Sequence, residues 1–127
     1  MIMEKGPKIY NLGVLDEKTY SFALRIINAY KYLSSKNEFV LSKQLLRSGT
    51  SIGANCREAT YAQSKQDFIS KLSIALKETN ETIYWLELMH DAGYLTDEAF
   101  DSIHNDGLEI LKLLISIIKT SKLNLQN

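Results

Sequence analysis

Cysteine and proline are almost absent from this sequence, which contains one residue of each. The single cysteine, Cys56, excludes an internal disulfide and a cluster of thiolate metal ligands. No histidine lies near Cys56 in the sequence, so we expect a small buried apolar side chain and not a nucleophile. The single proline, Pro7, precedes the first long periodic segment, so proline does not interrupt any helix predicted after it.

Long apolar runs are also missing. No run reaches the ~18 residues that a membrane-spanning helix needs, and the longest candidate, Ile110–Ile118, is interrupted by Lys112 and Ser116. The first residues, MIMEKGPKIYNLG, contain no signal-peptide core. We therefore expect a cytoplasmic protein with no membrane partner.

The common motifs of catalysis and cofactor binding do not occur. The sequence has no GxxxxGKS/T phosphate loop, no GxGxxG turn after a strand and no HExxH metal motif. We interpret His90 as a solvent-exposed histidine at a helix end, and a metal site at His90 and Asp91 is the alternative. We expect no enzymatic activity, no cofactor and no metal.

Net charge is zero, with 15 basic and 15 acidic residues, but the two signs are unevenly distributed. Residues 1–65 contain ten Lys or Arg and five Asp or Glu, and residues 66–127 contain the reverse. From Glu78 to Glu109 there are nine acids and no Lys or Arg. This polarity is the clearest electrostatic feature of the chain.

What the sequence does contain is helical periodicity. Ser64 and Asp67 form a variant of the capping box, Gly93 is typical of a helix end, and Thr96 is typical of a helix start. Four long helices joined by short turns predict an all-α single domain over residues 1–127, an antiparallel up-down-up-down four-helix bundle. The expected elements are an N-terminal arm at 1–15 and helices at about 16–35, 40–62, 65–92 and 97–121.

The apolar positions exceed what one small bundle can bury. LEILKLLISIIK, in the fourth expected helix, is apolar over more than one stripe, and IYWLELM, which contains Trp85, is similar. Apolar surface of this kind usually becomes a subunit interface, so we expect self-association. The alternative is that the N-terminal segment PKIYNLGVL and long tyrosines cover the excess within one chain.

The stretch LLRSGTSIGANCREA carries two glycines inside an expected helix, each at a cost of about 1 kcal/mol relative to alanine. Gly49 and Gly53 are four residues apart, which predicts a stripe where another helix approaches closely. Polar residues of the same helix, Arg47, Ser51, Asn55 and Glu58, fall along one face, and the next helix contains Lys71, Glu78 and Glu81. We favour mutual pairing in a polar seam over a ligand or nucleic-acid surface.

In the expected bundle, basic residues gather at one end and the acids from Glu78 to Glu109 at the other. Helix dipoles alone favour part of this arrangement, but they do not explain Glu87 and Asp91 at the end of a helix. A basic surface is what nucleic-acid binding requires. The candidate contacts are Lys5, Lys8, Arg57, Lys65, Lys71, Lys119 and Lys122.

LLRSGTSIGANCREA followed by QSKQDFISKLSIALKETNETIYWLELMHDAGYL resembles the small four-helix-bundle proteins encoded in intervening sequences of bacterial 23S rRNA genes. The resemblance covers about Tyr20 to Ile118. It implies a homo-oligomeric ring, expected to be a homopentamer, with structural or interfacial roles for Arg47, Asn55 and Glu58. Relatives that assist reverse transcriptases of diversity-generating retroelements imply RNA or a nucleic-acid-processing protein as a partner.

Two hypotheses of different kinds follow. The first is a non-enzymatic homo-oligomeric module that binds RNA, or an RNA-processing or reverse-transcriptase partner, through basic ends. The alternative is a protein-interaction scaffold whose acidic pole binds a basic partner, without nucleic-acid binding.

Overall fold

The computed structural model describes residues 10–126, and all of its regular secondary structure is helical. The four helices are α1 (Val14–Ser35), α2 (Leu41–Thr60), α3 (Lys65–Asp91) and α4 (Asp97–Gln126). No strand occurs within the described part of the chain, so the predicted all-α class with four helices is confirmed. The largest difference from the expected boundaries is in α4, which continues past residue 121.

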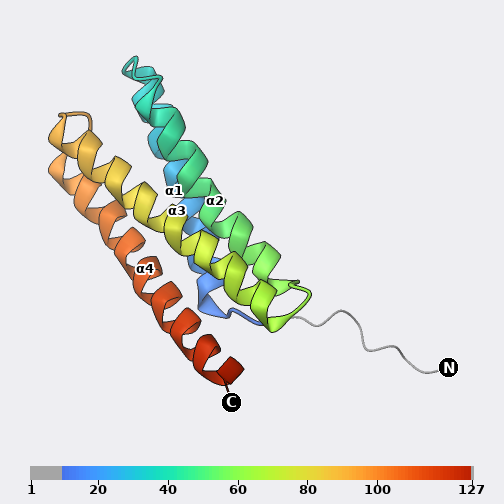
Figure 1. Ribbon diagram of the computed structural model, residues 1–127. Helices are drawn as coiled ribbons and strands as arrows, with labels where there is room; N and C mark the ends of the chain where they lie inside the picture. The colour runs from blue at the N-terminus through green and yellow to red at the C-terminus, as the bar shows by residue number, and fades with distance from the viewer. Residues whose placement is uncertain (1–9, 127) are drawn as a thin grey trace.

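Each helix lies against two others: α1 and α3 both pack on α2 and on α4. Figure 1 shows the 36–40 and 92–96 loops at one end of the molecule, and the 61–64 turn with the end of α4 at the opposite end. The α1/α2 pair and the α3/α4 pair diverge toward the end that carries the two loops (Figure 1). Consistent with this, the α1–α4 contact is the least extensive of the four.

Local sequence accounts for most helix ends. Ser64 Oγ accepts a hydrogen bond from the Asp67 N–H at 3.0 Å, and Asp67 Oδ2 accepts one from the Gln63 N–H at 3.1 Å, as in a capping box. Thr96 Oγ1 accepts a hydrogen bond from the Ala99 N–H at 3.2 Å. Gly93, with φ of 89°, follows the end of α3 in the left-handed conformation that glycine adopts without strain.

The start of α2 uses a different device. Glu38 is buried, with 7% of its surface exposed, although it lies in the loop before the helix. Its carboxylate accepts hydrogen bonds from the backbone N–H groups of Val40 (3.2 Å), Leu41 (3.1 Å) and Ser42 (2.8 Å). These are the N–H groups that a helix start leaves without partners, so Glu38 caps α2.

Apolar side chains from all four helices form one core, which includes Phe22, Leu45, Leu86 and Leu114. Cys56 belongs to this core and is fully buried, as predicted for a small apolar side chain. Burial raises the pKa of the Cys56 thiol to about 12, which keeps it protonated and unreactive. None of the helices in the described part of the chain is long and apolar enough to cross a membrane.

Candidate functional site

The glycine stretch of α2 packs against α1. A Cβ atom on Gly49 would lie 2.7 Å from Cγ1 and 2.8 Å from Cγ2 of Ile26, distances that side chains do not adopt. Ile26 is fully buried and β-branched, so it cannot rotate away. At Gly53 a Cβ would meet the backbone oxygen of Thr19 at 3.4 Å, a looser approach. Gly49 is thus the glycine whose missing side chain leaves room for Ile26 of α1, whereas Gly53 faces the α1 backbone.

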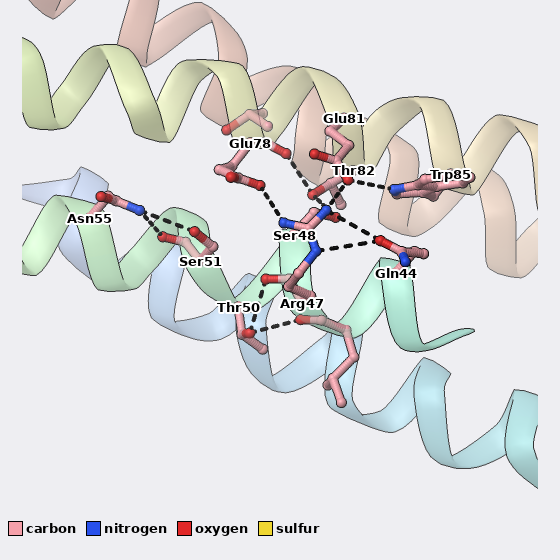
Figure 2. A network of polar contacts seen from close by, with 12 residues as sticks. Gln44, Arg47, Ser48, Thr50, Ser51, Asn55, Glu78, Glu81, Thr82 and Trp85 are labelled. Carbon is pink, nitrogen blue, oxygen red and sulfur yellow. Dashed lines mark hydrogen bonds and ion pairs between the residues drawn. The ribbon is translucent and has the colours of Figure 1, made fainter. Parts of the chain in front are cut away.

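A polar network joins the other side of α2 to α3 (Figure 2). The Arg47 guanidinium forms ion pairs with Glu81 and, at 3.3 Å, with Glu78, and it donates to Gln44 of its own helix. Trp85 Nε1–H donates to the same Glu81 carboxylate at 2.9 Å. The network therefore joins Arg47 of α2 to two acids of α3, and Trp85 is held within α3 by one of these acids.

Beneath this network, two buried hydroxyl groups meet between the helices. Thr82 Oγ1 lies 2.8 Å from Ser48 Oγ and also donates to the Glu78 backbone oxygen at 2.7 Å. Nearly three helical turns away, Lys71 of α3 pairs with Glu58 of α2 at 3.1 Å. The α2–α3 seam is thus held by ion pairs at two points, with a buried hydroxyl contact beside the Arg47 pairs.

Not every residue of the expected seam crosses it. The Asn55 side-chain amide donates to the Ser51 backbone oxygen at 2.9 Å and to Ser51 Oγ at 3.0 Å, so both side chains satisfy each other within α2. Figure 2 shows this pair set apart from the Arg47 network. Mutual pairing with α3 therefore involves Arg47 and Glu58, and not Asn55.

A second polar seam lies between α1 and α4, and the sequence did not predict it. Arg25 donates to the Ser102 backbone oxygen (3.3 Å) and hydroxyl (2.9 Å) and pairs with Asp106. Lys18 pairs with Glu109 at 2.8 Å, and that hydrogen bond raises the pKa of Lys18. Helical spacing places Asp106 and Glu109 on one face, but only the tertiary structure shows that this face lies against α1.

His90 lies in the last turn of α3, as expected, but it is less exposed than the expectation had it. Its side chain is only 26% exposed, because its ring stacks on Phe100 at a centroid distance of 4.2 Å, and Nε2 lies 2.7 Å from Asp97 Oδ1. His104 stacks on Phe100 at 4.6 Å and lies 2.9 Å from Glu87 Oε2. Among residues 10–126, no three His, Cys, Asp or Glu side chains are grouped so that they could hold a metal ion.

The end of the molecule that carries the 61–64 turn is rich in basic side chains. Lys65 of α3 lines a groove of about 530 Å³ together with Ile117 and Ser121 of α4, which places Lys119 and Lys122 in the adjacent turns. Lys71 is paired with Glu58. Within the described residues, the other cations of this end have no acidic partner, and we call them the basic end: Arg57, Lys65, Lys119 and Lys122. The candidates Lys5 and Lys8 lie outside the described residues.

The acids do not gather at the opposite end, contrary to the expectation. Glu78 and Glu81 pair with Arg47, and Asp106 and Glu109 pair with α1, so these four are distributed along the length of the bundle. The reason is that α3 and α4 are long: Glu78 lies 13 residues before the end of α3 at Asp91, which is about 20 Å of helix. Acids without a partner in the described chain include Glu98 and Asp101, both exposed.

Several large apolar side chains remain exposed on this chain. Part of the apolar surface is covered by the N-terminal arm, as in the alternative to self-association. Tyr10 stacks on Phe68 at 4.6 Å, and Leu12 is buried. Trp85 is half-buried beside the exposed Tyr84. The exposed apolar side chains include Leu24, Phe39, Val40, Tyr84, Ile115 and Leu123, with exposed fractions from 49% to 73%.

The fold and the seams define a class: an all-α protein of four helices, joined by polar contacts between neighbouring helices. A family model described as 23S rRNA-intervening sequence protein matches residues 14–116. The chain belongs to this family, as its resemblance implied.

A solved structure agrees with this assignment. It is a protein of unknown function from the S23 ribosomal protein family of Bacteroides thetaiotaomicron, with 62% sequence identity and a TM-score of 0.82. The similarity covers 83% of this chain and 98% of that one. No curated protein matches the chain.

Proposed function

We propose that this chain is a non-enzymatic helical module, an antiparallel up-down-up-down bundle of which several copies assemble into a cytoplasmic ring. A homopentamer is the number that the family resemblance implies. Exposed apolar side chains on α1, α3 and α4, such as Leu24, Tyr84 and Ile115, support assembly, because apolar patches on a small domain often mark an interface.

The proposed activity of the ring is RNA binding through the basic end. The observation that carries it is that Arg57, Lys65, Lys119 and Lys122 have no acidic partner in the described chain, whereas Arg25 and Arg47 are paired within the bundle. Free cations at one end of a helical bundle are available to neutralise phosphates. The exposed Tyr61 ring lies beside Arg57 and offers a surface on which an unpaired base can stack.

Binding of labelled single-stranded RNA at two salt concentrations tests this proposal. Four phosphate contacts should weaken binding roughly 50-fold between about 50 and 200 mM salt. The double variant Arg57→Ala/Lys65→Ala should bind more weakly and lose about half of the salt dependence. The matched control, Lys77→Ala/Lys112→Ala, removes two exposed lysines from other surfaces and should bind like the parent. Absence of measurable affinity at about 50 mM salt would rule out the RNA part.

The scaffold alternative draws on the exposed and unpaired Glu98 and Asp101 at the start of α4. A basic protein partner would be captured there, and the charge reversals Asp97→Lys, Glu98→Lys and Asp101→Lys should abolish its capture. Unchanged capture of the same partner by the triple variant would count against the scaffold.

A further inference from the structure

The loop between α1 and α2 displays two large apolar side chains to solvent. These are the consecutive residues Phe39, which is 51% exposed, and Val40, which is 73% exposed. Their backbone is held firmly, because the buried Glu38 carboxylate accepts hydrogen bonds from the N–H groups of Val40 and the next two residues. Two apolar side chains held outward on a capped loop are arranged to enter an apolar site on another molecule.

The same loop carries positive charge. Residues 31–43, which we call the lysine tip, contain three lysines and one acid, the buried Glu38. Lys31, Lys36 and Lys43 are exposed and have no acidic partner among residues 10–126; Lys36 lies 5.7 Å from the centre of the Tyr32 ring.

The loop between α3 and α4 carries the opposite charge. Residues 91–101, which we call the acidic tip, contain four acids and no Lys or Arg. The His90 ring contacts the carboxylates of Asp97 and Asp91. Glu98 and Asp101 are exposed and unpaired in the described chain. Both tips lie at the same end of the molecule, where the two helix pairs diverge (Figure 1).

An apolar groove of about 400 Å³ lies between α1 and α4 beside the acidic tip. It is of the size that binding sites for small apolar groups have. Its apolar lining is formed by Ala29, Tyr32, Leu86, Leu95, Ala99 and Ile103. Tyr32 also belongs to the lysine tip, and Arg25, which pairs with Asp106, lines the groove as well.

We propose that the lysine tip of one copy inserts Phe39 and Val40 into the α1–α4 groove of a second copy, with Lys36 and Lys43 against Glu98 and Asp101. This inference rests on the proposed assembly and names its interface. The occupant is another copy because this chain carries both halves, an apolar projection flanked by cations and an apolar groove next to the exposed acids of the acidic tip. The projection and the groove are different surfaces, so a head-to-tail series of copies uses both and closes into a ring where its rotation allows, whereas a reciprocal pair of copies would stop at the dimer.

Light scattering on the full chain, with variants of each half, tests the proposal. The parent should form an assembly several times the 14.5 kDa mass of one chain. Phe39→Ser/Val40→Ser should shift it to the monomer with unchanged helical circular dichroism, because both side chains are exposed. Lys36→Glu/Lys43→Glu and Glu98→Lys/Asp101→Lys should each dissociate it too, since each places like charges on both halves.

Recombination of the two charge variants is the decisive arm. In the mixture, the tip of each variant meets the groove of the other with opposite charge, so mixed assemblies should form although neither variant assembles alone. Because two alternating variants cannot close a ring of five, the mixed assemblies should differ in mass from a parent pentamer. The quadruple variant, which exchanges the charges within one chain, should assemble like the parent. Lys77→Glu/Lys112→Glu is the matched control and should leave the parent mass unchanged.

The remaining outcomes separate this inference from the proposed function. An assembled parent whose tip variants keep the parent mass would overturn the interface and leave assembly standing. Variants that keep the parent mass but lose RNA affinity would show that the lysine tip contacts RNA, which also overturns the interface. A monomeric parent would overturn both the interface and the proposed ring.

Discussion

Gly49 shows how one residue sets the spacing of two helices. The absence of a side chain allows Ile26 of α1 to occupy the space where a Cβ would lie, at 2.7 Å from it. Glycine costs about 1 kcal/mol relative to alanine in a helix, and the close packing of α1 on α2 offsets that cost. Gly53 is in a looser position, with its nearest α1 atom at 3.4 Å, so the two glycines should respond differently to the same change.

We expect Gly49→Ala to lower the free energy of unfolding by about 1–3 kcal/mol, because the added methyl group must displace a buried β-branched side chain. Gly53→Ala should stay within about 1 kcal/mol of the parent, since better helix propensity compensates for a tight contact. Urea denaturation followed by circular dichroism measures both. Equal effects at the two positions would contradict this account.

The chemistry of Cys56 follows from its burial. Because the pKa is raised from 9.0 to about 12, the folded protein keeps the thiol proton between these values while the unfolded chain loses it. The unfolded state is then favoured as pH rises, so this group's contribution to stability is present below pH 9 and is lost as pH rises toward 12.

We expect the parent to lose more stability than Cys56→Ala when both are taken from pH 8 to pH 11, by up to about 1.4 kcal/mol per pH unit above the thiol's ordinary pKa. Subtracting the stability of Cys56→Ala from that of the parent at each pH removes the effect of lysine and tyrosine titration, which both proteins share. Chemical denaturation at several pH values gives the difference. Parallel pH profiles for the two proteins would show that the thiol titrates freely in the folded state.

At the scale of elements, α2 begins in an unusual way. Its N-terminal N–H groups are satisfied by the carboxylate of Glu38, which precedes the helix by three residues and is buried. Asn37 before it takes a positive φ of 66°, which turns the chain and places the carboxylate beneath the helix start.

Replacement of Glu38 by alanine should cost about 1–2 kcal/mol, because three hydrogen bonds at the helix start are lost. Glu38→Gln retains one acceptor oxygen and should cost less. Amide hydrogen exchange should accelerate in the first turn of α2 in Glu38→Ala. A variant with parent stability and parent exchange in that turn would rule out the capping role.

At the scale of the whole molecule, the four seams differ in strength. The α1–α4 contact is the least extensive, and Arg25 connects it through Ser102 and Asp106. In the more extensive α2–α3 contact, Arg47 takes the corresponding place with Glu78 and Glu81. Both arginines are partly exposed, so each ion pair contributes about 1 kcal/mol or less to stability.

We expect Arg25→Met and Arg47→Met to have similar small effects on global stability but different local effects. Arg25→Met should accelerate amide exchange over the first turns of α4, because little other packing holds that part of α4 to α1. Arg47→Met should leave exchange in α2 and α3 nearly unchanged. Identical exchange maps for the two variants would show that the α1–α4 seam is no weaker than α2–α3.

Particular residues show how far sequence reasoning reaches. Helix spacing, the Ser64 and Asp67 cap and the turn at Gly93 are local, and they predicted four helices with small errors at the ends. The pairing of Arg47 with α3 was also predicted, because i, i+3 spacing places its partners Glu78 and Glu81 on one face. The stacking of His90 on Phe100 was not, since it joins α3 to a helix whose rotation the sequence does not specify.

By itself, the sequence determined the class of the protein, its helices and its family, because periodicity and capping are properties of neighbouring residues and LLRSGTSIGANCREA is distinctive. Only the tertiary structure decided which charges remain free. Opposite charges on different helices neutralise each other when packing brings them within a few ångströms, as Arg25 and Asp106 do. The unpaired Lys36, Lys43, Glu98 and Asp101, in or close to the two loops at one end of the molecule (Figure 1), are what this packing leaves exposed.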